Sequence, residues 1–450
     1  MNERFERVII IMGWCLNASK FMSKFQIIFL SLCIFFIVVG VILFAGLKSG
    51  SNQELPQVTI WGLMSQDIFA QYISNLNAVA AEPLKVEYIE KDPGTFDREF
   101  VEALALGQGP DLVLISQDFI LKEQNKLYII PYEAVSERTF KDTFIEEAEL
   151  LLTKEGLIGI PFSVDPLVMY WNRDIFSGAA LARFPEFWED VTAYTPKLVN
   201  RDNASNISGA AVALGEARNV NHAKEIIATL LMQAGNPIVM RDESSRAVSV
   251  IDKSFSRTPS PIESVLGFYT GFSNPTSPIY TWNRALPTSK NFFISGDVAM
   301  YFGPASEVSE LRAKNPQLNF DVALFPQPKQ NKNKLTFGTM YAFAIPRNSP
   351  SIGAAYSVLS TLTSANALKM WTDLTYLPPV RRDLLALGTT DPYLSIFYTS
   401  AIMARGWLDP DSNATTNLFQ NMVESVISGK ERANEAAVRT NGLLQQLITP

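Results

Sequence analysis

The sequence contains little cysteine and histidine. Among 450 residues there are two cysteines, Cys15 and Cys33, and a single histidine, His222. Because both cysteines precede residue 50, the rest of the chain offers no disulfide, no cysteine nucleophile and no Cys/His metal site. A Ser-His-Asp triad would depend on His222, which starts a helical pattern in NVNHAKEIIATLL and is predicted to be solvated or to cap a helix. No cofactor or metal is therefore expected.

Blocks of basic residues are also missing. Lys and Arg number 38 against 45 Asp and Glu, which gives a formal net charge of −7 and a pI near 5.1. Nucleic acid is therefore not an expected partner. Apolar residues make up 47% of the chain, enough to build a sizeable core.

One long apolar run stands near the N-terminus. Residues 25–47 read FQIIFLSLCIFFIVVGVILFAGL, and about 20 apolar residues suffice to span a bilayer. We expect a transmembrane signal anchor here, with residues 1–24 in the cytoplasm and the long remainder on the extracytoplasmic side of the cell membrane. This orientation follows from the basic residues that precede the run, Arg4, Arg7, Lys20 and Lys24.

Two other interpretations of this run are open. A cleaved signal would need a small-residue site, and only a poor one exists around Ala45. A lipoprotein signal would use Cys33, but Leu32 precedes it and the cysteine lies in the middle of the run. Met22 is an alternative start. Residues 48–57 are predicted to form a short flexible linker.

Strand-like and helix-like segments alternate after the linker. Strands are predicted at 58–63, 84–91 and 111–116, with helices at 66–81 and 96–107 between them. In GQGPDLVLISQDF the order is helix, then strand, so its two glycines end a helix and do not form a dinucleotide-binding loop. This β-α-β-α-β order predicts a mostly parallel sheet covered by helices.

The remaining pattern favours two α/β lobes, because about 390 residues exceed the usual size of one core. Further strands are predicted at 157–162, 167–172, 207–215, 298–304, 320–326 and 339–346. Helices are predicted at 219–234, 262–272, 305–314, 351–373, 393–404, 414–428 and 432–447. Residues 240–262 and 273–290 are interpreted as long loops.

Short polar side chains and aromatic rings gather where the predicted strands end. In open α/β sheets ligands bind beyond the carboxyl ends of the strands, so these residues are candidates for a binding site. Amides and carboxylates bond to hydroxyls, and aromatic faces stack on sugar rings, so the mixture favours a carbohydrate. Trp282 and Trp407 lie in loop-like stretches and are further candidates; a core position is the alternative for each tryptophan.

Several segments resemble one family in the same order along the chain. SVDPLVMYWNRDIF with PEFWEDV, FISGDVAMYFGPASEV, GQGPDLVLIS and the stretch from SIGAAYSVLS to LPPVRRDLL resemble blocks of the extracellular solute-binding proteins of ABC importers. The similarity covers nearly all of residues 57–450 and points to the sugar-binding group typified by maltose-binding protein.

This resemblance implies a type II periplasmic-binding-protein-like fold, with two lobes joined by three hinge crossings near 162–165, 326–338 and 377–382. The N-terminal lobe would comprise 58–163 and 338–379, and the C-terminal lobe 164–337 and 380–450. It implies a receptor, not an enzyme, that delivers a solute to ABC permease subunits. The ligand-binding residues that it implies are Trp61, Ser65, Ser116, Gln117, Asp118, Asp165, Ser306 and Tyr341.

The sequence departs from the family pattern at three points. Ala305 stands where maltose-type binders often carry a stacking tryptophan, Thr339 replaces a glycine, and a membrane helix replaces the lipoprotein cysteine. The sugar is therefore unassigned, and a compatible solute, a polyamine or a peptide stays an alternative ligand. A glycosidase that uses Asp118 and Asp165, or a permease-independent surface sensor or adhesin, is the alternative function.

Overall fold

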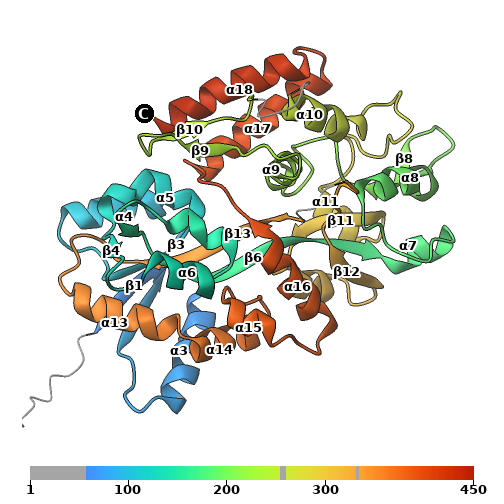
Figure 1. Ribbon diagram of the computed structural model, residues 1–450. Helices are drawn as coiled ribbons and strands as arrows, with labels where there is room; N and C mark the ends of the chain where they lie inside the picture. The colour runs from blue at the N-terminus through green and yellow to red at the C-terminus, as the bar shows by residue number, and fades with distance from the viewer. Residues whose placement is uncertain (1–56, 254–259, 331–333, 450) are drawn as a thin grey trace, which may run out of the picture. The chain divides into compact units, whose positions relative to one another are not determined.

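The computed structural model describes residues 57–253, 260–330 and 334–449, which belong to one compact unit, Gln57–Pro450 (Figure 1). The predicted membrane helix at 25–47 lies outside the described residues. Within the described ranges, no helix combines the length and the apolar character that crossing a bilayer requires.

The first three long strands form the parallel sheet that the sequence predicts. Their order is β1 (Val58–Gly62), α3 (Gln66–Val79), β2 (Val86–Glu90), α4 (Phe96–Ala105) and β3 (Leu112–Ser116). β1 lies between β2 and β3 and is parallel to both. The strands β1 and β3 therefore end at the same edge of the sheet, followed by α3 and by α5 (Gln117–Glu123).

Two long strands connect this sheet to the second half of the molecule. β6 (Ile160–Asn172) and β13 (Thr336–Ala344) are antiparallel neighbours in a ten-stranded sheet. Eight of its strands follow the order β2-β1-β3-β13-β6-β11-β8-β7, and the other two pair with β6 and with β13. The predicted strands at 157–162 and 167–172 are one continuous strand, β6. Pro166 is tolerated inside it because β6 there changes its neighbour from β13 to β11 and β12.

The second half of the sheet carries β8 (Ile207–Val212), β11 (Val298–Pro304) and β12 (Phe320–Leu324). β11 is parallel to β8 and antiparallel to β6, and β12 pairs with β6. The short edge strand β7 (Asn200–Arg201) ends this side. The predicted loop at 240–262 contains a hairpin of β9 (Val239–Arg241) and β10 (Ala247–Ser249), which turns at Asp242–Arg246.

Helices cover both halves. Around β1–β3 lie the 3-10 helices η2 (Gln124–Lys126) and η3 (Glu146–Leu151), the short strands β4 (Ile130–Pro131) and β5 (Gly156–Leu157), α6 (Glu137–Thr143), α13 (Ile352–Leu362), α14 (Ala365–Thr375) and α15 (Arg382–Ala386). Around β8 and β11 lie α7 (Arg173–Gly178), α8 (Trp188–Leu198), α9 (Ala223–Gln233), α10 (Pro261–Gly271), α11 (Ser289–Ile294), α12 (Glu307–Lys314), α17 (Ser412–Ile427) and α18 (Ala433–Ile448). α16 (Pro392–Met403) and β14 (Ala404–Arg405) lie between the two halves, and each contacts β13.

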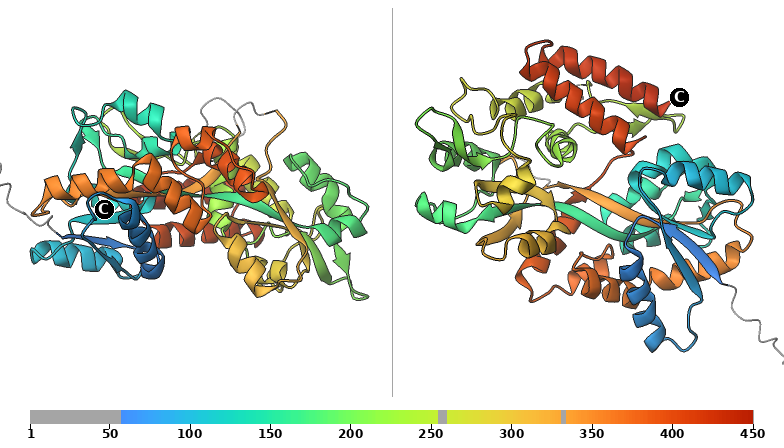
Figure 2. Two further views of the ribbon diagram at one scale, coloured as in Figure 1. Left: turned by 90° about the horizontal axis from the view of Figure 1, so that it is seen from below. Right: turned by 180° about the vertical axis from the view of Figure 1, so that it is seen from behind.

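The buried apolar residues separate into two cores, and each defines a lobe. The first lobe is built around Phe69, Phe162 and Phe343, and the second around Tyr170 and Phe293. Figure 2 shows β6 and β13 running from one lobe into the other. The two-lobed α/β architecture expected from the sequence is thus present.

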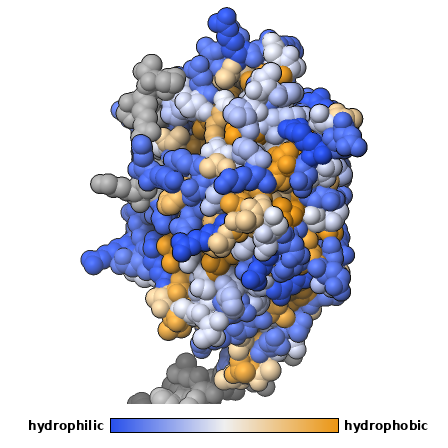
Figure 3. All heavy atoms as spheres, turned by 90° about the vertical axis from the view of Figure 1, so that its right-hand side faces the viewer, coloured by the Kyte–Doolittle hydropathy of each residue, from blue (hydrophilic) through white to orange (hydrophobic). Residues whose placement is uncertain are grey.

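The surface on the right-hand side of Figure 1 is mostly hydrophilic, with apolar side chains in small groups between the polar ones (Figure 3). Such scattered exposure is normal for folded proteins. The feature that positions a site is therefore the junction of the two lobes.

Candidate functional site

The strands that join the lobes bring polar side chains together on one face of the sheet. Tyr341 of β13 pairs with Ser116 of β3 on one side and with Ser163 of β6 on the other. Thr339 of β13 pairs with Asp165 of β6. Because side chains alternate between faces every second residue and paired residues share a face, these five residues lie on the same side. We call Ser116, Asp165, Thr339 and Tyr341 the polar floor.

Exposure supports this assignment. β13 is buried along its length except at Thr339 and Tyr341, and Ser116 is the only partly exposed residue of β3. In the segment Ile160–Met169 of β6, Asp165 alone is partly exposed. The polar floor is therefore the part of the central sheet that solvent, or a solute, can reach.

Asp118 and Gln117 follow β3 in the first turn of α5 and differ in their contacts and exposure. Asp118 accepts a hydrogen bond from the Ser116 hydroxyl and is partly exposed. Gln117 is 4% exposed, donates through Nε2 to the Gly338 carbonyl at 2.8 Å and accepts from the Met340 N–H at 2.7 Å. Gln117 thus fixes α5 to β13, and Asp118 remains available at the edge of the polar floor.

Asp165 is the carboxylate at the point where β6 passes between the lobes. It accepts a hydrogen bond of 3.0 Å from the backbone N–H of Ser306 at the start of α12. Burial raises the pKa of the Asp165 carboxyl to about 6, the bonds from Ser306 oppose this shift, and the charge of Glu307 adds to it. Burial also raises the pKa of the Tyr341 hydroxyl, helped by the charges of Asp165 and Asp118.

A charged network lies behind Ser306 in the second lobe. Glu307 is 9% exposed; its Oε1 lies 3.0 Å from His222 Nε2 and 3.0 Å from Lys290 Nζ, and its Oε2 accepts a 2.6 Å bond from the Tyr301 hydroxyl. Burial lowers the pKa of His222, but the bond to Glu307 and its charge outweigh burial and raise it. His222 occupies the N-cap position of α9, yet its ring pairs with Glu307 and does not cap the helix.

A second buried ion pair lies across from Asp118. Lys224 of α9 is 5% exposed, and its Nζ lies 2.9 Å from Asp409 Oδ2 and 3.0 Å from Ser412 Oγ. Burial lowers the pKa of Lys224, and the charges of Asp409, Glu225 and, more weakly, Asp118 raise it overall. Next to this pair, Lys122 Nζ of the first lobe lies 3.5 Å from Asp411 Oδ2 of the second, so the two lobes are close to each other here.

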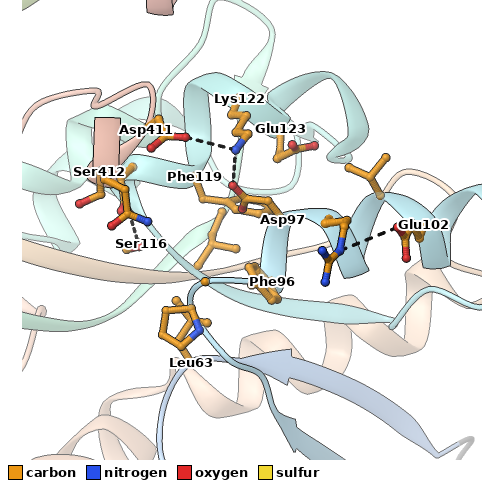
Figure 4. Close-up of a pocket in the computed structure, with 17 residues that line it drawn as sticks. Leu63, Phe96, Asp97, Glu102, Ser116, Phe119, Lys122, Glu123, Asp411 and Ser412 are labelled. Carbon is orange, nitrogen blue, oxygen red and sulfur yellow. Dashed lines mark hydrogen bonds and ion pairs between the residues drawn. The ribbon is translucent and has the colours of Figure 1, made fainter. Parts of the chain in front are cut away.

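A cavity of about 720 Å³ lies where the lobes meet (Figure 4). Its first-lobe wall includes Leu63, Phe96, Ser116 and Asp118, and its second-lobe wall is the segment Asp411–Asn413 at the start of α17. Lys122 closes the rim: its Nζ contacts Asp97 of its own lobe and lies 3.5 Å from Asp411 Oδ2 of the other. A cavity of this size suits a small solute.

The remaining predicted residues lie elsewhere. Ser65 is exposed at the start of α3, and Trp61 is partly exposed with Lys91 Nζ 3.7 Å from its ring centroid. Trp282 is fully buried in the second core, where its Nε1 donates to Asn219 Oδ1 at 3.1 Å. Trp407 is 3% exposed and packs in the same core. The structure therefore brings Ser116, Asp118, Asp165, Ser306 and Tyr341 together, but not the tryptophans.

Sequence reasoning missed the buried ion pair of Lys224 with Asp409 and its neighbour Ser412. Lys224 stands in an apolar helical run, NHAKEIIATLL, where a lysine needs a partner, and this was the available signal. Asp409 and Ser412 gave no such signal in the sequence, because their contacts with Lys224 of α9 join residues that are far apart in the chain. Within the described ranges, no cluster of three or more histidine, cysteine or acidic residues is arranged to hold a metal.

One buried carboxyl group lies against β13, one of the two strands that join the lobes. Glu147 of η3 is 2% exposed, and neither of its oxygens has a hydrogen-bond partner among the residues that the structure describes. Its carboxyl group packs against two glycines. A Cβ added to Gly338 of β13 would clash with Glu147 Oε2, and a Cβ added to Gly406, which follows β14, would lie 2.7 Å from Glu147 Oε1. Burial raises the pKa of Glu147 to about 8, opposed by the charge of Arg405. At neutral pH this group is therefore largely protonated.

Several solved structures with this architecture are named as sugar-binding proteins or hold a bound sugar. The cyclic α-maltosyl-1,6-maltose-binding protein of Arthrobacter globiformis has a TM-score of 0.71 at 15% identity, over 87% of this chain and 99% of that one. An ABC transporter solute-binding protein of Thermotoga lettingae bound to α-D-tagatose gives 0.62 at 20% identity, over 87% and 99%. The maltotriose-bound maltose/maltodextrin-binding domain of Bdellovibrio bacteriovorus gives 0.65 at 13% identity, over 88% and 100%.

At such low identity these likenesses show the fold. A comparison with curated proteins found no match. The family model for bacterial extracellular solute-binding proteins matches residues 71–393, which is more than half of the chain. The chain belongs to the family of bacterial extracellular solute-binding proteins.

Proposed function

We propose that this protein is an extracytoplasmic receptor that captures a saccharide between its lobes and delivers it to ABC permease subunits. The observation that carries the proposal is the polar floor, which spans the strands joining the lobes and is bonded to the second lobe through the Ser306 N–H and the Asp165 carboxylate. Sugar receptors share the fold, and hydroxyl, carboxylate and phenol groups of this kind bond to sugar hydroxyls.

Residues from both lobes would contact the solute only when the lobes are closed. Asp118 and Ser116 come from the first lobe, Ser306 from the second, and Asp165 and Tyr341 from the strands between them. A solute that bonds to both sets stabilises the closed arrangement, because an open arrangement offers only half of the contacts.

We further propose that residues 25–47 tether the receptor to the cell membrane, with the lobes on the extracytoplasmic side. The run is long and apolar, and the preceding positive charges orient it. After a carbonate wash of membranes, the full-length protein should stay in the membrane fraction. A soluble form that begins near residue 46 would show that the segment is cleaved.

Binding is tested by thermal unfolding of the full chain with mono- and oligosaccharides, polyamines and amino acids. A ligand at about a hundredfold excess over its Kd should stabilise the protein by roughly 2.7 kcal/mol. At least one saccharide should raise the melting temperature, and Asp118→Ala should reduce that shift. Unchanged melting with every saccharide would overturn the proposal.

A further inference from the structure

We propose that Glu147 controls the position of the two lobes through its proton. With the proton bound, Glu147 holds the lobes in the arrangement described above; without it, an arrangement in which the lobes are displaced from each other is favoured. Such control goes beyond the receptor function proposed above and does not depend on which solute binds. Three features of the molecule support it: the segments that Glu147 contacts, the lack of hydrogen bonds to its carboxyl group, and the charges around it.

Two segments that lead from one core to the other pass beside Glu147. The first is residues 337–340 of β13, which begin in the second core and end in the first. The second is residues 404–411, which begin in the first core and end where α17 of the second lobe starts. We call them the crossing segments, and they are neighbours because β13 pairs with β14. Displacement of the lobes has to change the backbone of such connections.

Glu147 contacts each crossing segment at a glycine. A side chain on Gly338 would clash with Glu147 Oε2, and a Cβ on Gly406 would lie 2.7 Å from Oε1, so the two glycines make room for the carboxyl group. The helix that carries this group belongs to the first lobe, because Ala148 and Leu151 of η3 lie in the first core. A group of the first lobe thus packs against two connections to the second.

The carboxyl group is held there without hydrogen bonds. Glu147 is 2% exposed, and within the described ranges neither of its oxygens has a donor. The side-chain amide of Gln117 also lies against Gly406, but its Nε2 donates to the Gly338 carbonyl. Such burial is tolerated by a neutral carboxyl group and is far more costly for a charged one. Loss of the proton therefore favours a movement that brings the carboxylate to water or to a cation.

The cations around Glu147 are already bonded. The elements packed on η3 are β13, β14 and α6, and α5 and the segment before α15 lie close by. Their charged groups and partners are Arg405 with Glu146, Lys141 with Glu137 and Glu149, Arg138 with Asp142, Arg381 with Asp383, Arg382 with the Phe144 carbonyl, and Asp118 with Ser116. Tyr341 of β13 belongs to the polar floor, on the face opposite to Gly338. An ionised Glu147 has no free counter-charge in this arrangement.

The pKa of Glu147 gives the direction of the effect. Burial raises this pKa from 4.5 to about 8, and the charge of Arg405 opposes the rise. The arrangement described above is therefore fully favoured at low pH, and this advantage is lost as pH rises through about 8. Up to that pH, the ratio of displaced to described arrangement should rise by at most about tenfold per pH unit, and it should level off above. In a receptor that holds a solute between its lobes, solute retention would follow the same dependence.

The test measures the distance between the lobes by double electron–electron resonance on the full chain without solute. Val79→Cys in α3 of the first lobe and Val438→Cys in α18 of the second provide labelling sites, since these side chains are 69% and 59% exposed. Cys15→Ser and Cys33→Ser remove the two natural thiols. We expect one distance distribution at about pH 6, a second that grows toward about pH 9, and recovery of the first when the pH is lowered again.

Variants assign the effect to Glu147. Glu147→Gln has no proton to lose, so its distances should stay at their low-pH values throughout; Glu147→Leu, which needs no hydrogen bond, replaces it if it fails to fold. Glu149→Gln, in the same 3-10 helix with its side chain 44% exposed, is the matched control and should behave as the wild-type protein does. Arg405→Gln removes the charge that opposes the rise in the pKa, so the transition should move to higher pH.

Each outcome supports or overturns the proposal. A change of distance in the wild-type protein and in Glu149→Gln that is absent from Glu147→Gln supports it. Distances that do not change with pH overturn it, and so does a change that persists in Glu147→Gln, because another group would then control the lobes. Loss of the helical circular dichroism signal over the same pH range also overturns it, since the chain would then unfold. None of these results bears on the receptor function, which thermal unfolding with saccharides tests separately.

Discussion

Lys122 of α5 lies 3.5 Å from Asp411 at the start of α17, and this ion pair joins the first lobe to the second. Both side chains are about two-fifths exposed, so the pair is screened by salt and contributes little by itself. The pair lies at the rim of the cavity, where the proposed closure of the lobes would form it (Figure 4).

The first prediction concerns this contact. Lys122→Met should weaken solute binding by about 0.5–1 kcal/mol at low salt, because the closed arrangement loses one inter-lobe pair. Titration calorimetry at low and high salt measures the difference, which should vanish at high salt. Lys369→Met removes a more exposed pair within α14 and should leave affinity unchanged. Equal effects of the two variants would show that the Lys122 contact does not act between lobes.

The second prediction concerns the pH dependence of folding at the hinge. The Glu147 pKa is raised from 4.5 to about 8, so the folded state keeps a proton that the unfolded state has lost between these values. Its contribution to stability is fully present below pH 4.5 and is lost as pH rises through about 8. Arg405, which pairs with Glu146, is the nearby charge that opposes this shift.

The glutamine in Glu147→Gln cannot titrate. The variant should therefore become more stable relative to the wild-type protein as pH rises. The difference in the free energy of unfolding should grow by roughly 3–5 kcal/mol between pH 5 and pH 9. Chemical denaturation at several pH values measures it. Glu149→Gln, in the same 3-10 helix but with its side chain 44% exposed, is the control and should show no such trend. A constant difference for Glu147→Gln would mean that the carboxyl is ionised throughout.

The third prediction tests the packing of Glu147 on the hinge strand. A Cβ on Gly338 would stand 2.3 Å from Glu147 Oε2 and 2.8 Å from Ala404 Cβ, so Gly338→Ala should destabilise by about 1–3 kcal/mol. Adding Glu147→Ala should recover part of the loss, since it removes the closer atom. Gly442→Ala, in α18 with nothing within 4 Å, should instead stabilise by about 0.5–1 kcal/mol. Strict additivity in the double variant would contradict this contact.

Much of the fold followed from local patterns. The alternation from 58 to 116 predicts the parallel strands β1 to β3, because apolar periodicity reports which face of a helix or strand is buried. Ser116 and Asp118 were expected where the strand at 111–116 ends, and they lie there; Asp165 was expected just after a strand at 157–162 but lies inside the continuous strand β6. The single strand β6 was predicted as two strands, because a proline such as Pro166 usually ends a strand. The change of partner strands that allows β6 to continue past Pro166 is a tertiary feature.

What failed to follow from the sequence depends on contacts between distant segments. The pair of Lys224 with Asp409 joins residues 185 positions apart, and no local pattern reports it. Glu147 resembles any acidic residue of a surface turn until η3 packs on β13. The loop tryptophans are the reverse case: TSPIYTWNRALP is loop-like around Trp282, yet tertiary packing buries the ring fully.

The fourth prediction uses that burial to decide the role of the tryptophans. Trp282→Ala should destabilise the protein by about 3–5 kcal/mol, because it removes a fully buried side chain and leaves Asn219 without its donor. Trp61→Ala should cost much less stability, because that ring is partly exposed and lies against Lys91. Denaturant midpoints and calorimetric affinities of both variants separate the two roles.

The solute affinities of the tryptophan variants, compared with that of the wild-type protein, decide whether Trp61 stacks on the solute. If Trp61 does not stack on the solute, Trp61→Ala should leave binding nearly unchanged, and Trp282→Phe, which keeps the core filled, should do the same. A loss of about 1–3 kcal/mol of binding energy in Trp61→Ala with stability intact would assign stacking to that ring. Lys91 would then have to leave the ring face of Trp61 when the solute binds.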